Sequence, residues 1–412
     1  MEGARELKKI EGGVTAAKGY QASAAAAGIK YQGRTDMALV YTEKPAVCAG
    51  TFTTNVVKAA PVLWDKEIVA KGAPVHAVVL NSGIANACTG EEGKQQNAAM
   101  AVAVADQLDI RTEEVLTAST GVIGMQLPLE PLQKGAVLLK QNLSAGREAA
   151  EAAARAIMTT DTVPKEAAVS FEVDGVTVTV GGMSKGSGMI HPNMATMLSV
   201  TTTDAAISRE DLQELTKEAV ADSFNMISVD RDTSTNDTYL VLANGASGIT
   251  IQKGMKAYED FKEALNYVST ELAKQMAADG EGATKLFEVK VVHCESREKA
   301  KTLGKSVITS NLVKTAVFGS DANWGRILCA LGYAGVPFNP EIIDLTLEAE
   351  GTSLVLVQDG VATDYSEGKA TELLSKQKVT VICDMKEGDS SATAWGCDLT
   401  YDYVKINGDY RS

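Results

Sequence analysis

The chain has 412 residues, of which 45% are hydrophobic, and a formal net charge of -14 at pH 7, so it can build one large domain or two with substantial cores. The negative charge argues against a general nucleic-acid binder or a binder of anionic membranes, because both partners would be repelled. The first nine residues lack the apolar core of a secretion signal, and no apolar run approaches the roughly eighteen residues of a membrane span, so we expect a cytoplasmic protein.

Strands and helices are predicted to alternate along the chain, without a low-complexity segment, a short repeat or a flexible linker. An alanine-rich helix is expected over residues 147–158. A β-hairpin is expected over 169–180, because residues alternate in period two on both sides of Asp174-Gly175.

Two longer helices are predicted after the hairpin. One covers 209–221, with Ser208 and Asp211 as a start that resembles a capping box, and the other covers 258–278 and ends before Gly280. The fold class is therefore mixed α/β, and the sequence marks no boundary between domains.

The cysteines and histidines show no pattern of a metal site. The cysteines have no CxxC spacing, and the histidines lie far apart in the chain. We therefore expect reduced, mostly buried thiols and no metal centre. The residues concerned are Cys48, Cys88, Cys294, Cys329, Cys383, Cys397, His76, His191 and His293.

A glycine-rich run precedes Thr196. Gly186, Gly188 and Pro192 can form a strained loop that presents the Thr196 hydroxyl to the Ala195 carbonyl for an N-to-O acyl shift and ester hydrolysis. The new terminal amine, with an ordinary pKa of about 7.7 to 8.0, would serve as the base that activates this hydroxyl. The same residues also fit a buried strand entered through a turn, so spacing alone leaves both interpretations open.

The dipeptide Thr120-Gly121 is a candidate oxyanion site. Acyl transfer needs hydrogen-bond donors where negative charge develops on the carbonyl oxygen, and backbone N–H groups in a tight turn supply them. From the residues alone, a plain connection from a strand to a loop is the favoured interpretation of this dipeptide.

Seven segments resemble, in the same order, the ornithine acetyltransferase family of arginine biosynthesis, also called glutamate N-acetyltransferases. One is the glycine-rich run KGSGMIHPNMATML at 185–198. The others are NSGIANA at 81–87, TASTGVIG at 117–124, MTTDT at 158–162, DGEGATK at 279–285, GSDANWGR at 319–326 and INGDYRS at 406–412.

The resemblance implies a role for each matching position. Thr196 would be the nucleophile, released by cleavage after Ala195, and the Thr120 hydroxyl and Gly121 N–H would form the oxyanion hole. Three implied substrate contacts are the Thr159 hydroxyl, the Lys185 cation for a carboxylate and the Glu281 carboxylate that orients an amine. The resemblance also implies that the C-terminal tail folds back to the pocket, where Asn407 and Ser412 contact the substrate.

The implied activity is a ping-pong transfer of acetyl from N-acetylornithine to glutamate, which yields ornithine and N-acetylglutamate without a cofactor. Some members of the family also accept acetyl-CoA as donor, and we favour that bifunctional activity here. Two alternatives remain open. One is a related self-processing amidase or aminopeptidase that uses water, and the other is an uncleaved, non-catalytic protein that binds amino acids.

The resemblance also implies how the molecule is organised. Self-cleavage would give an α chain, 1–195, and a β chain, 196–412, that stay packed together as α2β2 or α4β4 assemblies. The implied fold is the aminopeptidase/ornithine-acetyltransferase type, with sheets layered between helices in two lobes and the active site between the lobes. Lobe boundaries within the two chains are not readable from the sequence.

Two polar segments receive no catalytic role. Residues 231–238 are expected near the strand of the nucleophile. Residues 319–326 either bring the Asn323 amide near the site or only start the helix that continues through 327–331, and we favour the supporting role.

Overall fold

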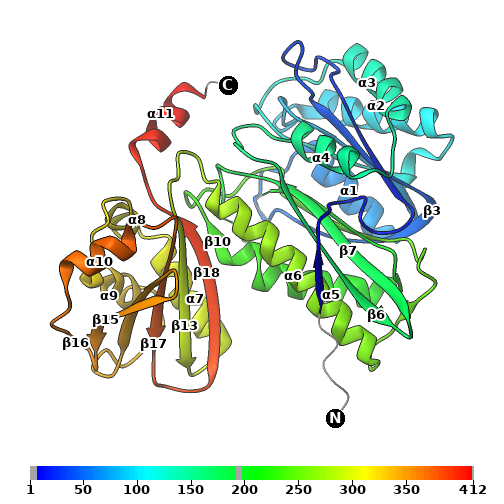
Figure 1. Cartoon of the computed structure of the whole chain (residues 1–412). Helices are drawn as coiled ribbons and strands as arrows, with labels where there is room; N and C mark the ends of the chain where they lie inside the picture. Colours follow the sequence, from blue (N-terminus) through cyan, green and yellow to red (C-terminus); the bar gives the residue numbers. More distant parts are fainter. Residues whose placement is uncertain (1–6, 192–196, 411–412) are drawn as a thin grey trace.

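The structure is a computed structural model that describes residues 7–191 and 197–410. Two lobes stand side by side, each built on its own β-sheet with helices packed against it (Figure 1). The mixed α/β class predicted from the sequence is confirmed.

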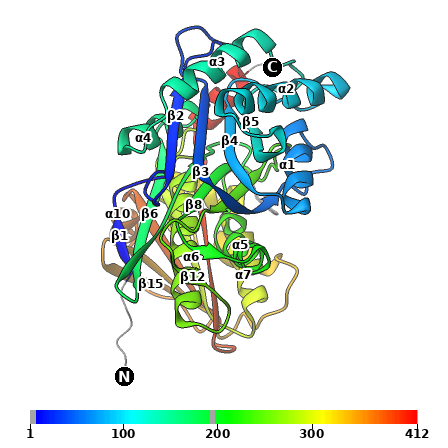
Figure 2. The same ribbon diagram turned by 90° about the vertical axis from the view of Figure 1, so that its right-hand side faces the viewer.

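Nine strands of the described residues form the larger sheet: β1 (Lys8–Ile10), β2 (Tyr20–Ala25), β3 (Met37–Phe52), β4 (Val75–Asn81), β5 (Val115–Ser119), β6 (Lys165–Val173), β7 (Val176–Lys185), β8 (Leu198–Thr203) and β11 (Thr238–Ala243). Their order is β1-β6-β7-β8-β11-β3-β4-β5, and β2 pairs with β3. Figure 2 shows β2, β3 and β4 side by side. β8 and β11 run parallel to each other and antiparallel to their outer neighbours, β7 and β3.

The central strand β11 is buried on both faces of this sheet. Tyr239 and Val241 pack into one hydrophobic core, and Leu240 and Leu242 pack into another on the opposite face. This explains why the strand is continuously apolar in sequence and shows no alternation.

Helices cover both faces of the larger sheet. α5 (Arg209–Asp222) and α6 (Lys256–Ala278) contribute to the core beneath Tyr239, and α4 (Arg147–Ala156) packs on β2 and β3 in the other core. The remaining helices of this lobe are α1 (Ala60–Lys71), α2 (Gly90–Leu108) and α3 (Leu129–Gln141). Short pieces, β9 (Ala206–Ile207), β12 (Thr250–Ile251) and the 3-10 turns Thr112–Glu114 and Phe224–Met226, complete it.

Several predicted elements are confirmed, with small shifts at their ends. β6 and β7 are joined by Asp174 and Gly175 at φ 51° and 80°, the left-handed pair that a type I′ hairpin turn needs. The Ser208 side chain accepts the N–H of Asp211 at 3.1 Å and caps α5 as predicted. α4 ends two residues before the predicted residue 158, and α6 begins two residues before the predicted residue 258.

The smaller sheet has the order β10-β18-β13-β17-β14-β15-β16. Its strands are β10 (Ile227–Ser228), β13 (Leu286–Cys294), β14 (Asp344–Ala349), β15 (Thr352–Gln358), β16 (Val361–Ala362), β17 (Lys378–Asp384) and β18 (Ser390–Cys397). The helices of this lobe are α7 (Arg297–Ile308), α8 (Asn311–Phe318), α9 (Trp324–Gly332) and α10 (Glu367–Leu374). Asn323 accepts the N–H of Arg326 at 3.2 Å and caps α9, which is the supporting role favoured for segment 319–326.

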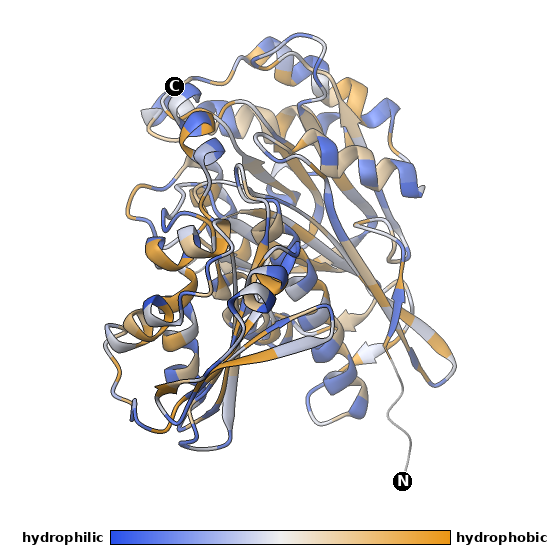
Figure 3. Cartoon of the chain, turned by 60° about the vertical axis from the view of Figure 1, so that its left-hand side comes forward, coloured by the Kyte–Doolittle hydropathy of each residue, from blue (hydrophilic) through white to orange (hydrophobic). Residues whose placement is uncertain are grey.

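The lobes meet at α6, which packs on β6 and β7 of the larger sheet and on β18 of the smaller. One hydrophobic core runs from α5 and α6 into the smaller lobe. Figure 3 shows hydrophobic and hydrophilic segments alternating along the helices, as expected of helices that bury one face. The last helix, α11 (Tyr401–Asp409), has no buried residue and extends from the smaller lobe towards the larger one.

Candidate active site

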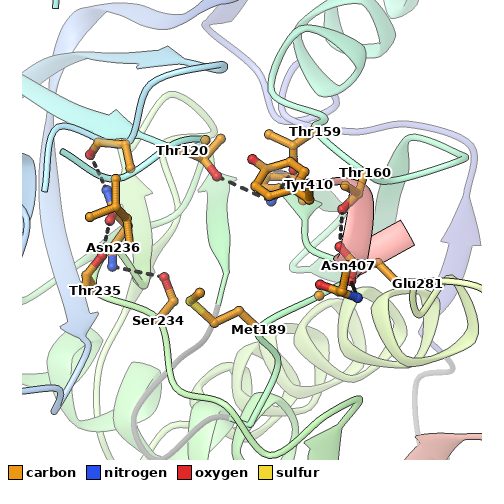
Figure 4. A pocket seen from close by; sticks show the side chains of 15 residues that line it. Thr120, Thr159, Thr160, Met189, Ser234, Thr235, Asn236, Glu281, Asn407 and Tyr410 are labelled. Carbon is orange, nitrogen blue, oxygen red and sulfur yellow. Dashed lines mark hydrogen bonds between the residues drawn. The ribbon is translucent and has the colours of Figure 1, made fainter. Parts of the chain in front are cut away.

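A pocket lies where the ends of β5 and β7 meet the loop after α6 and the C-terminal helix α11 (Figure 4). Its volume is about 130 Å³. Six of the predicted site residues line it together, although they come from distant parts of the sequence: Thr120, Gly121, Thr159, Lys185, Glu281 and Asn407. The other lining residues are Ala85, Ile123, Thr160, Gly188, Met189, Ser234, Thr235, Asn236 and Tyr410.

Gly121 occupies a position that no other residue could take. Its φ is +132°, and a Cβ built there would lie 2.2 Å from the carbonyl carbon of Gly83. The backbone at Gly121 lies this close to Gly83 because the N–H of Val122 donates to the Gly83 carbonyl at 3.1 Å. No acceptor among residues 7–191 and 197–410 binds the N–H of Gly121, so this donor is available to a ligand.

Thr120 can contribute only its side chain, because its backbone N–H donates to the Asn81 carbonyl at 3.0 Å. The Thr120 hydroxyl lies 3.4 Å from the Lys185 ammonium. Thr120 and Gly121 both line the pocket, and a hydroxyl with an adjacent backbone N–H is the kind of donor pair that an oxyanion requires.

Lys185 is the last residue of β7 and is buried. Its ammonium donates to the Thr159 hydroxyl at 3.0 Å and lies 3.9 Å from the Asp161 carboxylate. Burial lowers the pKa of Lys185, and the negative charge of Asp161 opposes that effect. Thr159 lies in the bend after α4.

A buried ionic cluster supports this wall of the pocket. The Asp161 carboxylate accepts Lys165 Nζ and the Gly186 N–H, each at 2.7 Å, and Lys165 Nζ also contacts Asp279 at 2.6 Å. Burial alone would raise the pKa of Asp161, but Lys185 and Lys165 hold it at about 2. The cluster holds the backbone directly after Lys185.

Glu281 faces Lys185 from the loop after α6. Its carboxylate accepts the Thr160 hydroxyl at 2.7 Å and the Asn407 amide at 2.6 Å (Figure 4). A Cβ at Gly188 would lie 2.3 Å from this carboxylate, so only glycine leaves room for it. Asn407 sits on α11, an ordered helix, in agreement with the expected return of the tail to the pocket.

Residues 234–236 also line the pocket, although no catalytic role was predicted for them. The Asn236 amide donates to the carbonyls of Ala85 and Ser119 at 2.6 and 2.8 Å, and so ties this segment to the end of β5. The segment precedes β11, the parallel neighbour of β8, which agrees with its expected position. The sequence signal for this segment was a polar run directly before a buried strand. Its place at the pocket depends on the pairing of β11 with β8, which are far apart in the sequence.

Described residues on either side of the predicted cleavage junction lie next to this pocket. Ile190, Met197 and Leu198 line a second hollow that shares Thr120 and Lys185 with the first. Residues 192–196, and so Ala195 and Thr196, lie outside the described residues, as does Ser412. The roles predicted for these three residues stay predictions.

Other predicted features concern the chain as a whole. All six cysteines lie within the described residues and are free, and four of them are buried. Within 7–191 and 197–410, no three His, Cys, Asp or Glu side chains cluster so that they could hold a metal ion. In the same part of the chain, no helix combines the length and the hydropathy that crossing a membrane requires.

Comparison with known proteins gives consistent matches. The model of the ArgJ family matches residues 21–412. The chain is 51% identical to the arginine biosynthesis bifunctional protein ArgJ 1 of Clostridium acetobutylicum, over 95% of this chain and 96% of that protein. It is 46% identical to the glutamate N-acetyltransferase of Methanocaldococcus jannaschii, over 98% of this chain and all of that protein. A solved chain of the ornithine acetyltransferase of Mycobacterium tuberculosis, in complex with ornithine, is 42% identical, with 47% of this chain and 100% of that chain covered and a TM-score of 0.43.

Proposed function

The chain belongs to the ArgJ family of arginine-biosynthesis enzymes, and from this premise we propose that it transfers acetyl from N-acetylornithine to glutamate through an acetyl-threonine intermediate on Thr196. The observation that carries the proposal is one pocket that combines an oxyanion donor pair, a buried cation and an opposing carboxylate. Ile190 and Met197, which lie on either side of the segment that contains Thr196, line an adjoining hollow.

The charges of the pocket match those of the donor substrate. N-acetylornithine has one carboxylate and one terminal ammonium, because its α-amine is acylated. Lys185 would bind the carboxylate and Glu281 the ammonium. The two charges are held apart by consecutive threonines, since Thr159 accepts from Lys185 at 3.0 Å and Thr160 donates to Glu281 at 2.7 Å.

Self-cleavage prepares the nucleophile. The Thr196 hydroxyl attacks the Ala195 carbonyl, the acyl group moves from nitrogen to oxygen, and water hydrolyses the ester. The products are a free carboxylate on Ala195 and a free α-amine on Thr196, which then serves as the base for the same residue.

Acetyl transfer then takes place in two half-reactions. Thr196 Oγ attacks the acetyl carbon while the α-amine takes its proton, and the oxyanion is bound by the Thr120 hydroxyl and the Gly121 N–H. The C–N bond breaks, and ornithine leaves with the proton on its amine. The α-amine of glutamate attacks the ester, N-acetylglutamate departs, and the proton returns to Thr196 Oγ.

Intact mass spectrometry of the wild type beside Thr196→Ala tests the nucleophile. Scaling 43.3 kDa by 195/412 and 217/412 gives fragments of about 20.5 and about 22.8 kDa for a chain cut by its own threonine. Thr196→Ala should stay intact, and Thr302→Ala, an exposed threonine of α7, should be cut like the wild type. Incubation of the cut protein with N-acetylornithine should add one acetyl group to the larger fragment.

A cut protein that hydrolyses N-acetylornithine without stimulation by glutamate would instead support the amidase alternative. An intact wild type that binds ornithine without turnover would refute the mechanism.

A second activity is proposed for the same site, because curated relatives such as that of Clostridium acetobutylicum are named bifunctional. Acetyl-CoA would acetylate Thr196, and glutamate would accept the acetyl group as before. Release of free CoA that depends on glutamate and is lost in Thr196→Ala would support this activity. No CoA release from a protein that is active with N-acetylornithine would restrict the enzyme to the first reaction.

A further inference from the structure

A polar turn, residues 228–233, contacts the chain segment just before residue 192. The Asp230 carboxylate accepts the N–H groups of Met189 and Ile190 at 2.7 and 2.9 Å. The Ile190 carbonyl accepts the Val229 N–H at 2.7 Å, and the Thr233 hydroxyl donates to the His191 carbonyl at 3.0 Å. Successive residues of the segment that leads to the predicted junction are thus fixed from one side.

Asp230 holds a backbone conformation that needs support. Met189 has φ +55°, in the left-handed region that a residue with a side chain seldom adopts, and it is 42% exposed. Little apolar burial is available to stabilise it there. The charge-assisted bonds to Asp230 are the contacts that keep this conformation.

The same carboxylate reaches the C-terminal helix. The Tyr403 hydroxyl donates to Asp230 at 3.2 Å, and burial together with the charge of Asp230 raises the pKa of Tyr403, so the hydroxyl keeps its proton. One turn further along α11, Asn407 donates to Glu281 at 2.6 Å. No residue of α11 is fully buried, although Tyr403 packs partly against the core, so these polar contacts contribute to how the helix docks.

We propose that Asp230 is a positioning residue through which α11 sets the backbone at Met189 and Ile190, so that self-cleavage and substrate binding both depend on how this helix is docked. The inference rests on the proposed function, because it assumes cleavage at Ala195-Thr196. Acyl shifts require the reacting atoms to be aligned closely, and a misplacement of about 1 Å can cost about 100-fold in rate.

The test compares the rate at which newly synthesised chains are cut, followed by intact mass, in three variants and the wild type. Asp230→Asn keeps the shape but loses the charge, and should slow cleavage about 10-fold or more. Tyr403→Phe removes one hydroxyl, and should slow cleavage by a smaller factor. It should also raise the KM for N-acetylornithine in fully cut protein, because Asn407 is no longer held in place.

Asp232→Asn is the matched control. It lies on the same turn and is exposed, and only its backbone N–H contacts Asp230, at 3.2 Å. It should be cut at the wild-type rate. The melting temperature of each chain, measured in the Thr196→Ala background, separates positioning from a general loss of stability.

The inference would be overturned if Asp230→Asn were cut at the wild-type rate. It would also be overturned if cleavage slowed in all three variants in proportion to their loss of melting temperature. Either result would leave the proposed function unaffected. A wild type that is not cut at all would refute the proposed self-cleavage, and the inference with it.

Discussion

Replacing Asp161 by asparagine tests whether the charge beneath the pocket wall stabilises the fold. The carboxylate accepts Lys165 Nζ and the Gly186 N–H at 2.7 Å and the Thr159 N–H at 3.1 Å. Asparagine has nearly the same shape and keeps one oxygen acceptor, but it has no charge. Because an NH2 group replaces one of the two accepting oxygens, the substitution changes hydrogen bonding as well as charge, and the pH dependence separates the two contributions.

The magnitude follows from the pKa of Asp161, which the two lysines hold at about 2 against an ordinary value of 3.8. This difference corresponds to about 2 kcal/mol at neutral pH, since each pKa unit is worth about 1.4 kcal/mol. Because the folded-state pKa is lowered, this stability is present above pH 4 and is lost as the pH falls towards 2. Lys165 keeps Asp279 at 2.6 Å, so this lysine should not be left as an unpaired buried charge.

Urea unfolding at pH 7, 4 and 2.5 measures the effect, in the Thr196→Ala background so that one intact chain unfolds. At pH 7, Asp161→Asn should lower the free energy of unfolding by about 2 kcal/mol, and the gap should close between pH 4 and 2. Asp174→Asn, in the exposed hairpin turn, is the control and should change little. A gap at pH 2.5 as large as at pH 7 would show that the loss comes from shape or hydrogen bonding, not from charge.

Three further predictions concern the pocket and the segment beside it. Gly121→Ala should lower kcat for acetyl transfer at least about 100-fold, because its Cβ would displace an oxyanion donor. Steady-state kinetics beside Thr120→Ala measures this, and activity within tenfold of the wild type would contradict it. Glu281→Gln should raise the KM for N-acetylornithine about 10-fold or more with a smaller change in kcat, because a charged contact is lost; an unchanged KM would remove Glu281 from the binding site. Burial lowers the pKa of His191 from 6.5 to about 4, so the unfolded chain takes up a proton first and the wild type should lose stability as the pH falls from 6.5 to 4. Urea unfolding of His191→Gln should show a flatter dependence over that range, and an identical slope would be evidence against the prediction.

Local features of the fold were predictable, and long-range ones were not. The hairpin at Asp174-Gly175 and the cap at Ser208 depend on residues a few positions apart, and both are found as predicted. The order of strands in the larger sheet depends on pairings between segments far apart, such as β11 with β3, which no local pattern encodes. The lobe boundary was unreadable for the same reason, since α6 packs on both sheets.

The candidate site shows a similar division. Lys185 and Glu281 were selected because they match a family pattern, and both line the pocket. Asp161 and Asp230 were not selected, because an aspartate beside threonines or in a polar run has the composition of an ordinary surface turn. Their burial and partners are created by tertiary packing. Buried charged residues are therefore the residues of a site that are hardest to predict from sequence composition.

The strand order of the larger sheet decides how the two products of a cut at Ala195-Thr196 can behave. β8 and β11, which follow the junction, lie between β7 and β3, which precede it, and they pair with both. Each product synthesised alone would have a central sheet that is either missing its two middle strands or reduced to them. Folding of the whole chain must therefore come before cleavage, and the cut products should exchange partners only by unfolding. A cut at this junction would leave the two products associated, because strand pairing in the larger sheet, and not the peptide bond, holds them together.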